Sequence, residues 1–223
     1  MARRQERGLS MIELLVGAAI GLIVVAGAGS IVAANQVDAR RVQLESRLMQ
    51  DLRAAAELVA RDLRRAGHWA AAASGVRRGD DVVATNPHVE IAPASAASTA
   101  VALSFSTGAG DPASVDDAER FGFRLRNGAI EMQLGARNWQ ALSDPGTVVV
   151  TSFSVVPHVD EVELGTFCAK PCAVGSTTCP PRQQICSYAI ALAGRSAVDP
   201  LVTRSLRSGV RVRNDVVVGS CEA

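Results

Sequence analysis

The N-terminal stretch constrains this chain more than any other feature, because a short basic segment leads abruptly into a long apolar run. Three arginines lie among the first eight residues, and after Glu13 no charged residue occurs until Asp38. Residues 14–37 would form a helix of roughly 36 Å at 1.5 Å per residue, whereas the hydrocarbon core of a bilayer is about 30 Å thick. The segment is therefore long and apolar enough to cross a membrane once.

Two details distinguish this stretch from an ordinary signal anchor or a cleaved secretory signal. The basic segment ends in a glycine, Gly8, and a carboxylate, Glu13, lies about one helical turn inside the hydrophobic boundary. A carboxylate in a membrane is costly and usually has a partner. We therefore expect Glu13 to bind a positive group.

Residues 8–13 read glycine, a hydrophobic residue, serine, two hydrophobic residues and glutamate, and this order resembles the type IV prepilin family. The resemblance implies that a prepilin peptidase cuts between Gly8 and Leu9, that Leu9 is then N-methylated, and that Glu13 contacts the N-terminal amine of a neighbouring subunit during assembly. Residues four apart share a helix face, so Glu13 can also neutralise the amine created at Leu9. Leu9 itself departs from the family, which most often has phenylalanine there.

The apolar stretch also holds a pair of glycines, Gly17 and Gly21, in a GxxxG spacing. Small residues four apart let a second helix approach closely, although glycine is common in membrane helices generally, so both interpretations stay open. The arginines before Gly8 keep residues 1–8 in the cytoplasm and send the remainder across the membrane. We therefore expect a single-pass inner-membrane protein with its C-terminal domain in the periplasm.

The helical pattern continues beyond the apolar stretch and becomes amphipathic over residues 38–67. Apolar residues recur at three- and four-residue steps, while most charged residues lie off that line. The apolar positions are Val37, Leu44, Leu48, Leu52, Ala55, Val59, Leu63 and Ala66. Gly67 follows as a plausible C-cap. The sequence predicts a helix of more than 50 residues, of which the second half packs on a sheet.

The end of this helix resembles a narrower group. Residues 57–68, ELVARDLRRAGH, look like the corresponding segment of PilW-type minor pilins. GspJ-type pseudopilins of type II secretion have a similar RDLR but usually lack the Ala-Gly pair that follows here. An alternative explanation for Asp62 is that it supports Arg61 or Arg65 on a solvated helix face.

The remainder of the chain predicts a β-rich domain. Residues 70–100 read as a loop, and apolar alternation then begins near Val101. Asn127-Gly128 separates two alternating runs, as in a hairpin with a type I′ turn. Further strands are expected at 147–157, 187–193 and 208–218. The fold class is therefore α+β and pilin-like: a long N-terminal helix packed on an antiparallel sheet with a disulfide-containing loop.

Five cysteines are expected outside the cytoplasm: Cys168, Cys172, Cys179, Cys186 and Cys221. The first four are predicted to lie in one loop. An oxidising periplasm favours two disulfides with one cysteine left over, and we prefer a pairing of Cys221 with a loop cysteine. Four cysteines so close together also suit zinc, but the spacing is not a pair of CxxC motifs. We expect no metal.

No residue set in the sequence supports an enzyme, and no cofactor is expected. His68, His88 and His158 are isolated, and no nucleophile elbow, P-loop or HExxH motif occurs. The acidic residues at 111–119 lack the EF-hand spacing and read as a solvated loop rather than a calcium site. Arginines from Arg204 to Arg213 could touch DNA phosphates, but no aromatic residue lies nearby to stack bases. Nucleic acid is therefore not an expected partner.

These observations predict four segments: a leader peptide (1–8), a transmembrane and filament-core helix (9–37), an amphipathic helix (38–67) and a periplasmic β-rich domain (68–223). The resemblance implies a minor pilin that joins other minor pilins in the priming or tip complex of a type IV pilus. Its implied partners are prepilin peptidase, other minor pilins, the major pilin, the inner-membrane assembly platform and the membrane. Two alternatives stay open: a type II secretion pseudopilin of the GspJ kind, and a membrane-anchored periplasmic binding or sensor protein.

Overall fold

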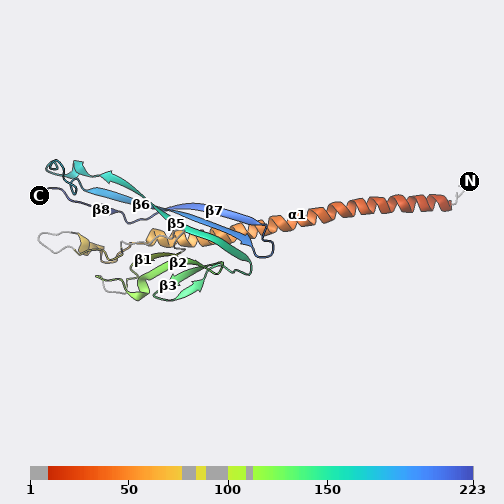
Figure 1. Ribbon diagram of the computed structural model, residues 1–223, viewed down its shortest axis with the longest axis horizontal. Coiled ribbons are helices and arrows are strands. Elements are labelled where there is room, and N and C mark those ends of the chain that lie inside the picture. The colour runs from red at the N-terminus through yellow and green to blue at the C-terminus, as the bar shows by residue number, and fades with distance from the viewer. Residues whose placement is uncertain (1–9, 77–83, 89–99, 109–112, 223) are drawn as a thin grey trace, which may run out of the picture. The chain divides into compact units, whose positions relative to one another are not determined.

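The computed structural model describes residues 10–76, 84–88, 100–108 and 113–222, so Gly8, Leu9 and the rest of the leader lie outside the described residues. One long helix, α1 (Met11–Arg65), precedes all the strands, as Figure 1 shows. Contacts within the chain divide it after Leu44 into two compact units, which are described separately.

The first unit is the helix up to Leu44. Every described side chain from Ser10 to Gln43 is exposed. An 18-residue window here has a mean hydropathy of 2.4, so the helix is long and apolar enough to cross a membrane. α1 has 55 residues in all, which confirms the prediction of a helix longer than 50 residues.

The second unit begins with the amphipathic part of α1, from Glu45 onward. Its apolar side is buried from Leu48, which is 1% exposed, to the end of the helix. The buried apolar residues of this part are Leu48, Leu52, Ala55, Ala56, Val59, Ala60 and Leu63. The predicted packing face began at Val37, which was wrong, because Val37 is 67% exposed and belongs to the uniformly apolar part of the helix. The buried face begins at Leu48.

Four strands form the first sheet, in the order β1 (Ala100–Ser104), β2 (Arg120–Arg126), β3 (Ala129–Leu134) and β4 (Trp139–Ala141), with each neighbouring pair antiparallel. The predicted hairpin is confirmed. Asn127 and Gly128 both have positive φ, 51° and 76°, as a type I′ turn requires. β4 was not predicted, because three residues are too few to show an alternation.

The second sheet is built on two long antiparallel strands, β5 (Val148–Glu163) and β6 (Arg182–Ser196). Residues 187–195 of β6 pair with β7 (Thr203–Arg211), and residues 182–184 pair with β8 (Val216–Val218). The predicted single strand at 208–218 was therefore wrong. The strands predicted at 147–157 and 187–193 were too short, because the last eight residues of β5 are exposed and show no burial pattern, yet they pair with β6 throughout.

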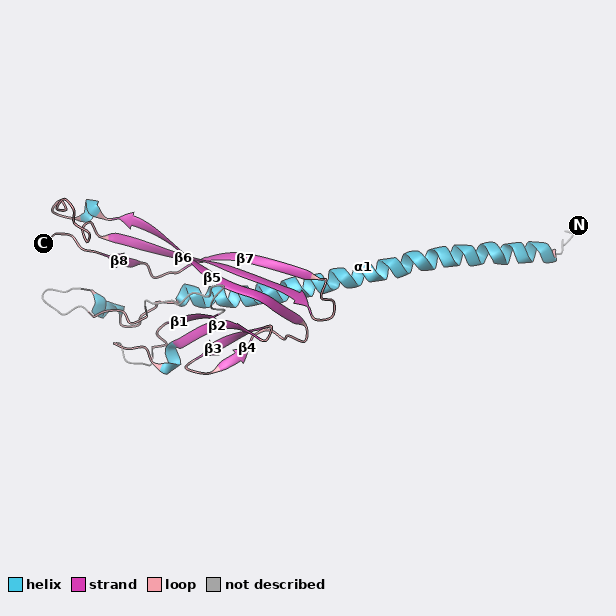
Figure 2. Cartoon of the chain, viewed as in Figure 1, coloured by secondary structure: helices cyan, strands magenta, loops and turns pink. Residues whose placement is uncertain are grey.

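The amphipathic part of α1 runs between the two sheets (Figure 2). On one side, Gly194 of β6 leaves space for Leu48 and Leu52, because a Cβ at that position would lie 3.4 Å from a methyl carbon of each. On the other side, the Arg65 guanidinium lies 4.2 Å from the ring centroid of Phe105, just after β1. The predicted pilin-like α+β class is confirmed, with the strands divided between two sheets.

Candidate functional site

The described part of the chain begins at a helix cap made by two residues of the prepilin-like motif. The Ser10 hydroxyl accepts a hydrogen bond from the Ile12 N–H at 3.3 Å, and Glu13 accepts one from the Ser10 N–H at 3.0 Å through Oε2. Ser10 is thus an N-cap, and the return bond to Glu13 is one half of a capping box, whose signature is serine followed three residues later by glutamate. Glu13 was expected only to bind an amine, so its capping role was missed, although the Ser-x-x-Glu spacing predicts it.

The glycine pair lies on open helix surface in the first unit. A Cβ added at Gly17 or at Gly21 would meet no described atom within 4 Å. Their neighbours along the helix are large apolar residues with exposed side chains, such as Ile20, which is 57% exposed. The surface therefore leaves room for close approach at the glycines and offers apolar side chains beside them.

The residues that resemble PilW-type pilins are the ones that tie α1 to the domain. Leu63 and Ala66 are fully buried, and Trp69 is 7% exposed. Asp62 is also buried, 3% exposed, and its Oδ1 accepts a bond from the Arg61 Nε at 3.0 Å. Asp62 therefore supports Arg61, as the alternative expected, but it does so from a buried position and not from a solvated helix face.

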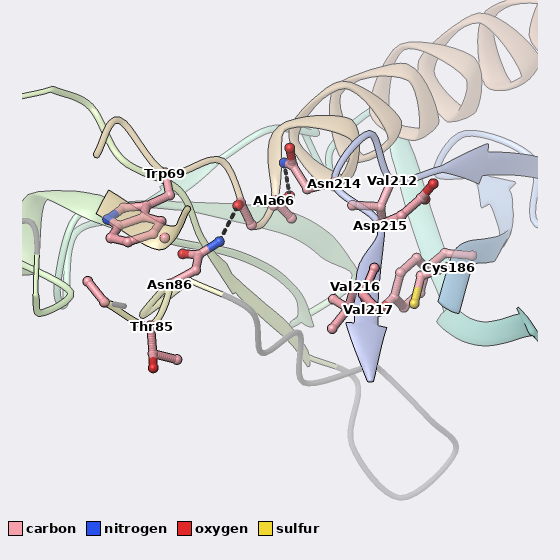
Figure 3. Close-up of a pocket in the computed structure, with 14 residues that line it drawn as sticks. Ala66, Trp69, Thr85, Asn86, Cys186, Val212, Asn214, Asp215, Val216 and Val217 are labelled. Atoms are coloured by element: carbon pink, nitrogen blue, oxygen red, sulfur yellow. Dashed lines mark hydrogen bonds between the residues drawn. The ribbon is translucent and has the colours of Figure 1, made fainter. Parts of the chain in front are cut away.

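Two asparagines complete the C-terminal end of α1. The Asn214 side chain donates to the Ala66 carbonyl at 3.1 Å, and the Asn86 side chain donates to the Gly67 carbonyl at 2.9 Å (Figure 3). Gly67 itself has φ +74°, the left-handed conformation expected of a C-cap, and its N–H donates to the Ser104 carbonyl. Carbonyls that the helix leaves unpaired are thus satisfied by residues far along the chain.

A pocket of about 440 Å³ lies beside this helix end. Its wall includes Trp69, Tyr188, Val212 and Val216, together with Cys186 of β6 (Figure 3). Burial, and then the charge of Asp215, raise the pKa of the Cys186 thiol. Cys186 is therefore a protonated thiol at neutral pH and a poor nucleophile, which argues against a reactive site here.

A buried ionisable pair lies on the first-sheet side of the domain. His88 and Glu119 are each 2% exposed, and His88 Nε2 lies 3.7 Å from Glu119 Oε2. Burial lowers the pKa of His88. Burial alone would raise the pKa of Glu119, but hydrogen bonds from the N–H groups of Thr107 and Asp116 outweigh it and lower that pKa. The sequence had suggested an isolated His88 and a Glu119 in a solvated acidic loop. Both expectations were wrong, because the two side chains are buried and lie next to each other.

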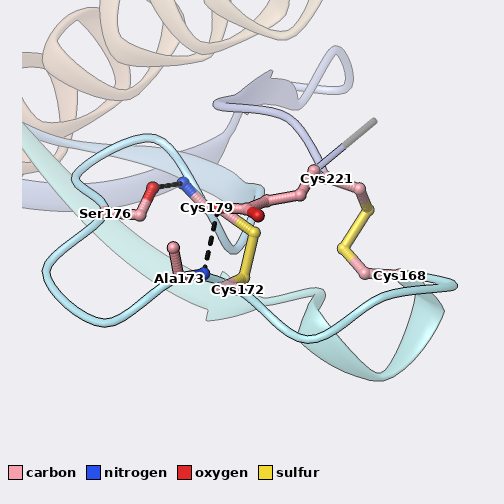
Figure 4. The surroundings of a disulfide bond; sticks show 7 residues. Cys168, Cys172, Ala173, Ser176, Cys179 and Cys221 are labelled. Carbon is pink, nitrogen blue, oxygen red and sulfur yellow. Dashed lines mark hydrogen bonds between the residues drawn. A yellow bond between two sulfur atoms is a disulfide. The ribbon is translucent and has the colours of Figure 1, made fainter.

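Four of the cysteines form two disulfides, Cys168–Cys221 and Cys172–Cys179 (Figure 4). They lie at the end of the second sheet where a loop joins β5 to β6. Cys221 is thus bonded to a loop cysteine, and Cys186 is the free thiol. Cys186 lies on β6 rather than in the predicted cysteine loop, because β6 begins at Arg182. Three of the four cysteines considered for zinc are in disulfides and have no thiolate to offer a metal. Across the described ranges, no group of three or more His, Cys, Asp or Glu side chains is arranged to hold a metal ion.

Comparison with known protein families agrees with this architecture. The family described as Prepilin peptidase-dependent protein B matches residues 41–212, which is well over half of the chain. The chain belongs to this family. Residues 3–29 separately match the prokaryotic N-terminal methylation motif. Comparisons with curated proteins and with solved structures give no match.

The two matches together cover the N-terminal motif and most of the domain. The methylation motif covers Gly8, Leu9, Glu13, Gly17 and Gly21, and the family match covers the amphipathic helix and both sheets up to Val212. The chain is thus a type IV prepilin-like protein, and its motif and apolar helix indicate anchoring in the inner membrane. The match is to this family and not specifically to PilW-type minor pilins.

Proposed function

We propose that this chain is a minor pilin, of the PilW type, which is processed by prepilin peptidase and then joins other minor pilins in the priming or tip complex of a type IV pilus. The observation that carries the proposal is the methylation motif over residues 3–29 on a helix whose apolar side chains are exposed as far as Gln43. Such a helix needs lipid before assembly and the helices of neighbouring subunits after it.

The four segments expected from the sequence correspond to steps of this process. Residues 1–8 are the leader, removed between Gly8 and Leu9. Residues 9–37 cross the membrane and later lie in the filament core, and residues 38–67 continue the helix into the periplasm. Residues 68–223 provide the surface for contacts with other minor pilins and the major pilin. The role is structural rather than catalytic.

Glu13 has two successive partners in this proposal. In the unprocessed chain it accepts the Ser10 N–H, one residue from the cleavage point. After cleavage, the amine of Leu9 on a neighbouring subunit is a stronger partner, because it carries a full positive charge and attracts the carboxylate as an ion as well as donating a hydrogen bond. The cap thus keeps the carboxylate satisfied until assembly supplies the amine. Gly17 and Gly21 then let the helices approach each other.

The first experiment measures the mass of the N-terminal peptide in cells with and without prepilin peptidase. We expect a peptide that begins at Leu9 and carries one added methyl group, only when the peptidase is present. A chain that keeps Met1, or one that begins near residue 30, would refute the proposal and favour a membrane-anchored sensor.

The second experiment replaces Glu13 by Ala and by Gln and measures the chain in sheared filaments by immunoblot. We expect processing to continue and incorporation to fall by about tenfold or more in both variants, because neither can neutralise an amine. The control is Asp51→Ala, which removes an exposed carboxylate from the same helix. Normal incorporation of both Glu13 variants would contradict the mechanism.

A type II secretion pseudopilin of the GspJ kind is the alternative within the same class, and the RDLR of residues 61–64 favours it as much as it favours a pilin. Deleting the gene separates the two functions. Loss of surface pili with normal secretion supports the pilus, and the opposite result supports the secretion machine.

A further inference from the structure

A groove of about 550 Å³ runs between the amphipathic part of α1 and β7. Three arginines and one glutamate line it, with small or half-buried residues between them. The lining residues are Arg53, Ala56, Glu57, Ala60, Arg64, Leu206, Arg207 and Ser208. The groove is therefore positively charged along its sides.

The three arginines of this groove are available to a partner. Arg53, Arg64 and Arg207 are all exposed, and none has an ion pair or a side-chain hydrogen bond within the part of the chain that the structure describes. Other arginines nearby are engaged: Arg204 pairs with Glu45, and Arg211 binds Asp215 at 2.8 Å. The contrast singles out the groove arginines, which offer guanidinium groups suited to bidentate binding of carboxylates.

The backbone of β7 is available as well. Among the described strands β7 pairs only with β6, so its other edge presents unpaired N–H and C=O groups. Such an edge can accept an added strand from another protein. Ala56 and Ala60, each 4% exposed, keep the floor beside this edge shallow and apolar.

We propose that this groove binds an extended, acidic segment of a neighbouring pilin-type subunit, which adds a strand to the free edge of β7. This inference rests on the proposed function for the identity of the partner. Carboxylates at alternate positions of such a strand lie on one face, where they meet the arginines. Nucleic acid fits less well, because the lining has no aromatic side chain on which bases could stack.

The direct test uses the full chain in detergent micelles and a fluorescent peptide that alternates glutamate and valine and matches the nine residues of β7 in length. The matched probe has glutamine in place of glutamate. We expect the acidic peptide to bind about tenfold or more tightly than the glutamine peptide, and its binding to weaken as salt is raised from about 0.05 to 0.5 M. Equal binding of the two peptides would overturn the proposal.

Charge reversal locates the site. We expect Arg207→Glu to weaken acidic-peptide binding by about tenfold, Arg207→Gln to weaken it less, and the double variant with Arg53→Glu to abolish it. Arg213→Glu is the matched control, because Arg213 is an exposed arginine outside the groove. An equal loss in the control, or displacement of the peptide by a single-stranded oligonucleotide at lower concentration, would overturn the assignment. Circular dichroism confirms that each variant is folded.

The partner is tested in cells with a photo-crosslinking residue in place of Ser208. We expect crosslinks to an acidic segment of another protein with a prepilin-type N-terminus, reduced by Arg207→Glu. Crosslinks only to lipid, to a second copy of this chain or to a protein without that N-terminus would overturn the assignment of the partner.

Binding of the acidic peptide to the groove does not require processing of the chain or filaments. A groove that binds in a chain never processed would therefore refute the pilin function alone, and a processed, incorporated chain that does not bind would refute the groove alone.

Discussion

The two parts of α1 have nearly the same backbone and opposite surroundings. Up to Gln43 every described side chain is exposed, apolar residues included, whereas from Leu48 onward the apolar side is buried in the domain. Leu22 is 70% exposed and Leu52 is 1% exposed, on one continuous helix. Apolar composition alone therefore does not tell where a helix is buried. The arrangement of the apolar residues around the helix does tell this. A helix that is apolar on all sides needs lipid or other helices around it, whereas an amphipathic helix packs its one apolar face on the rest of its domain.

The difference also separates stability from assembly. Core packing, two disulfides and buried polar groups hold the domain from Glu45 onward, and none of these involves the exposed apolar helix. Changes in the first part should therefore affect membrane insertion and assembly, and changes in the second part should affect folding of the domain.

The largest effect is expected from truncating the same residue type in each part. Leu52→Ala should lower the free energy of unfolding of the domain by about 2–5 kcal/mol, because it leaves a cavity against Gly194. Leu22→Ala should leave that free energy unchanged. Urea unfolding of the full chain in detergent, followed by tryptophan fluorescence, measures both. Equal effects of the two substitutions would mean that the two parts do not behave independently.

The disulfides sharpen the comparison within the domain. Cys168–Cys221 joins residues 53 apart, and Cys172–Cys179 joins residues 7 apart. In the chain-entropy account, the longer loop restricts the unfolded chain more, so removing the first bond should cost about 4 kcal/mol and removing the second about 2 kcal/mol.

The paired variants are Cys168→Ser with Cys221→Ser, and Cys172→Ser with Cys179→Ser, each compared with the parent by thermal unfolding. Neither pair should alter insertion of the helix into membranes. A larger loss from the shorter loop would show that the terminal disulfide is not the one that restricts the chain.

The sequence predicted the elements whose signals are local. The long helix, its amphipathic half and the Asn127-Gly128 hairpin each follow from a spacing or a turn within a few residues, and all are present. The burial limit at Leu48 was missed, because the periodic pattern extends a little way into the apolar stretch and does not reveal where the domain begins to cover it.

What the sequence did not reveal depends on contacts between distant residues. Nothing near His88 signals that it faces Glu119, and nothing near Asn214 signals that it binds the carbonyl of Ala66. The full extent of β5 was hidden for a related reason, since its outer half is held by pairing with β6 rather than by burial. The groove beside β7 likewise brings together residues that are far apart in the sequence, such as Arg64 and Arg207. No local pattern in the sequence could indicate that they line one groove.

The smallest predicted effect concerns pH and should again affect only the domain. Burial lowers the pKa of His88 below its ordinary value of 6.5, so below that pH the unfolded chain takes up a proton that the folded chain does not. The domain should lose stability as pH falls below about 6.5, by no more than about 1.4 kcal/mol per pH unit from this group. The lowered pKa of Glu119 has the same sign and adds a further loss below its ordinary value of 4.5.

His88→Asn isolates the first of these windows. It should reduce the change in midpoint temperature between pH 7.5 and pH 5.5, because the residue that gains a proton only on unfolding is gone. His158→Asn is the matched control, since the His158 side chain is 72% exposed and pairs with Asp160 at the surface. A midpoint that falls equally in both variants and in the parent would mean that His88 does not set the acid sensitivity. Since no described histidine lies in the exposed apolar part of α1, the helical content of that part should not change over the same pH range.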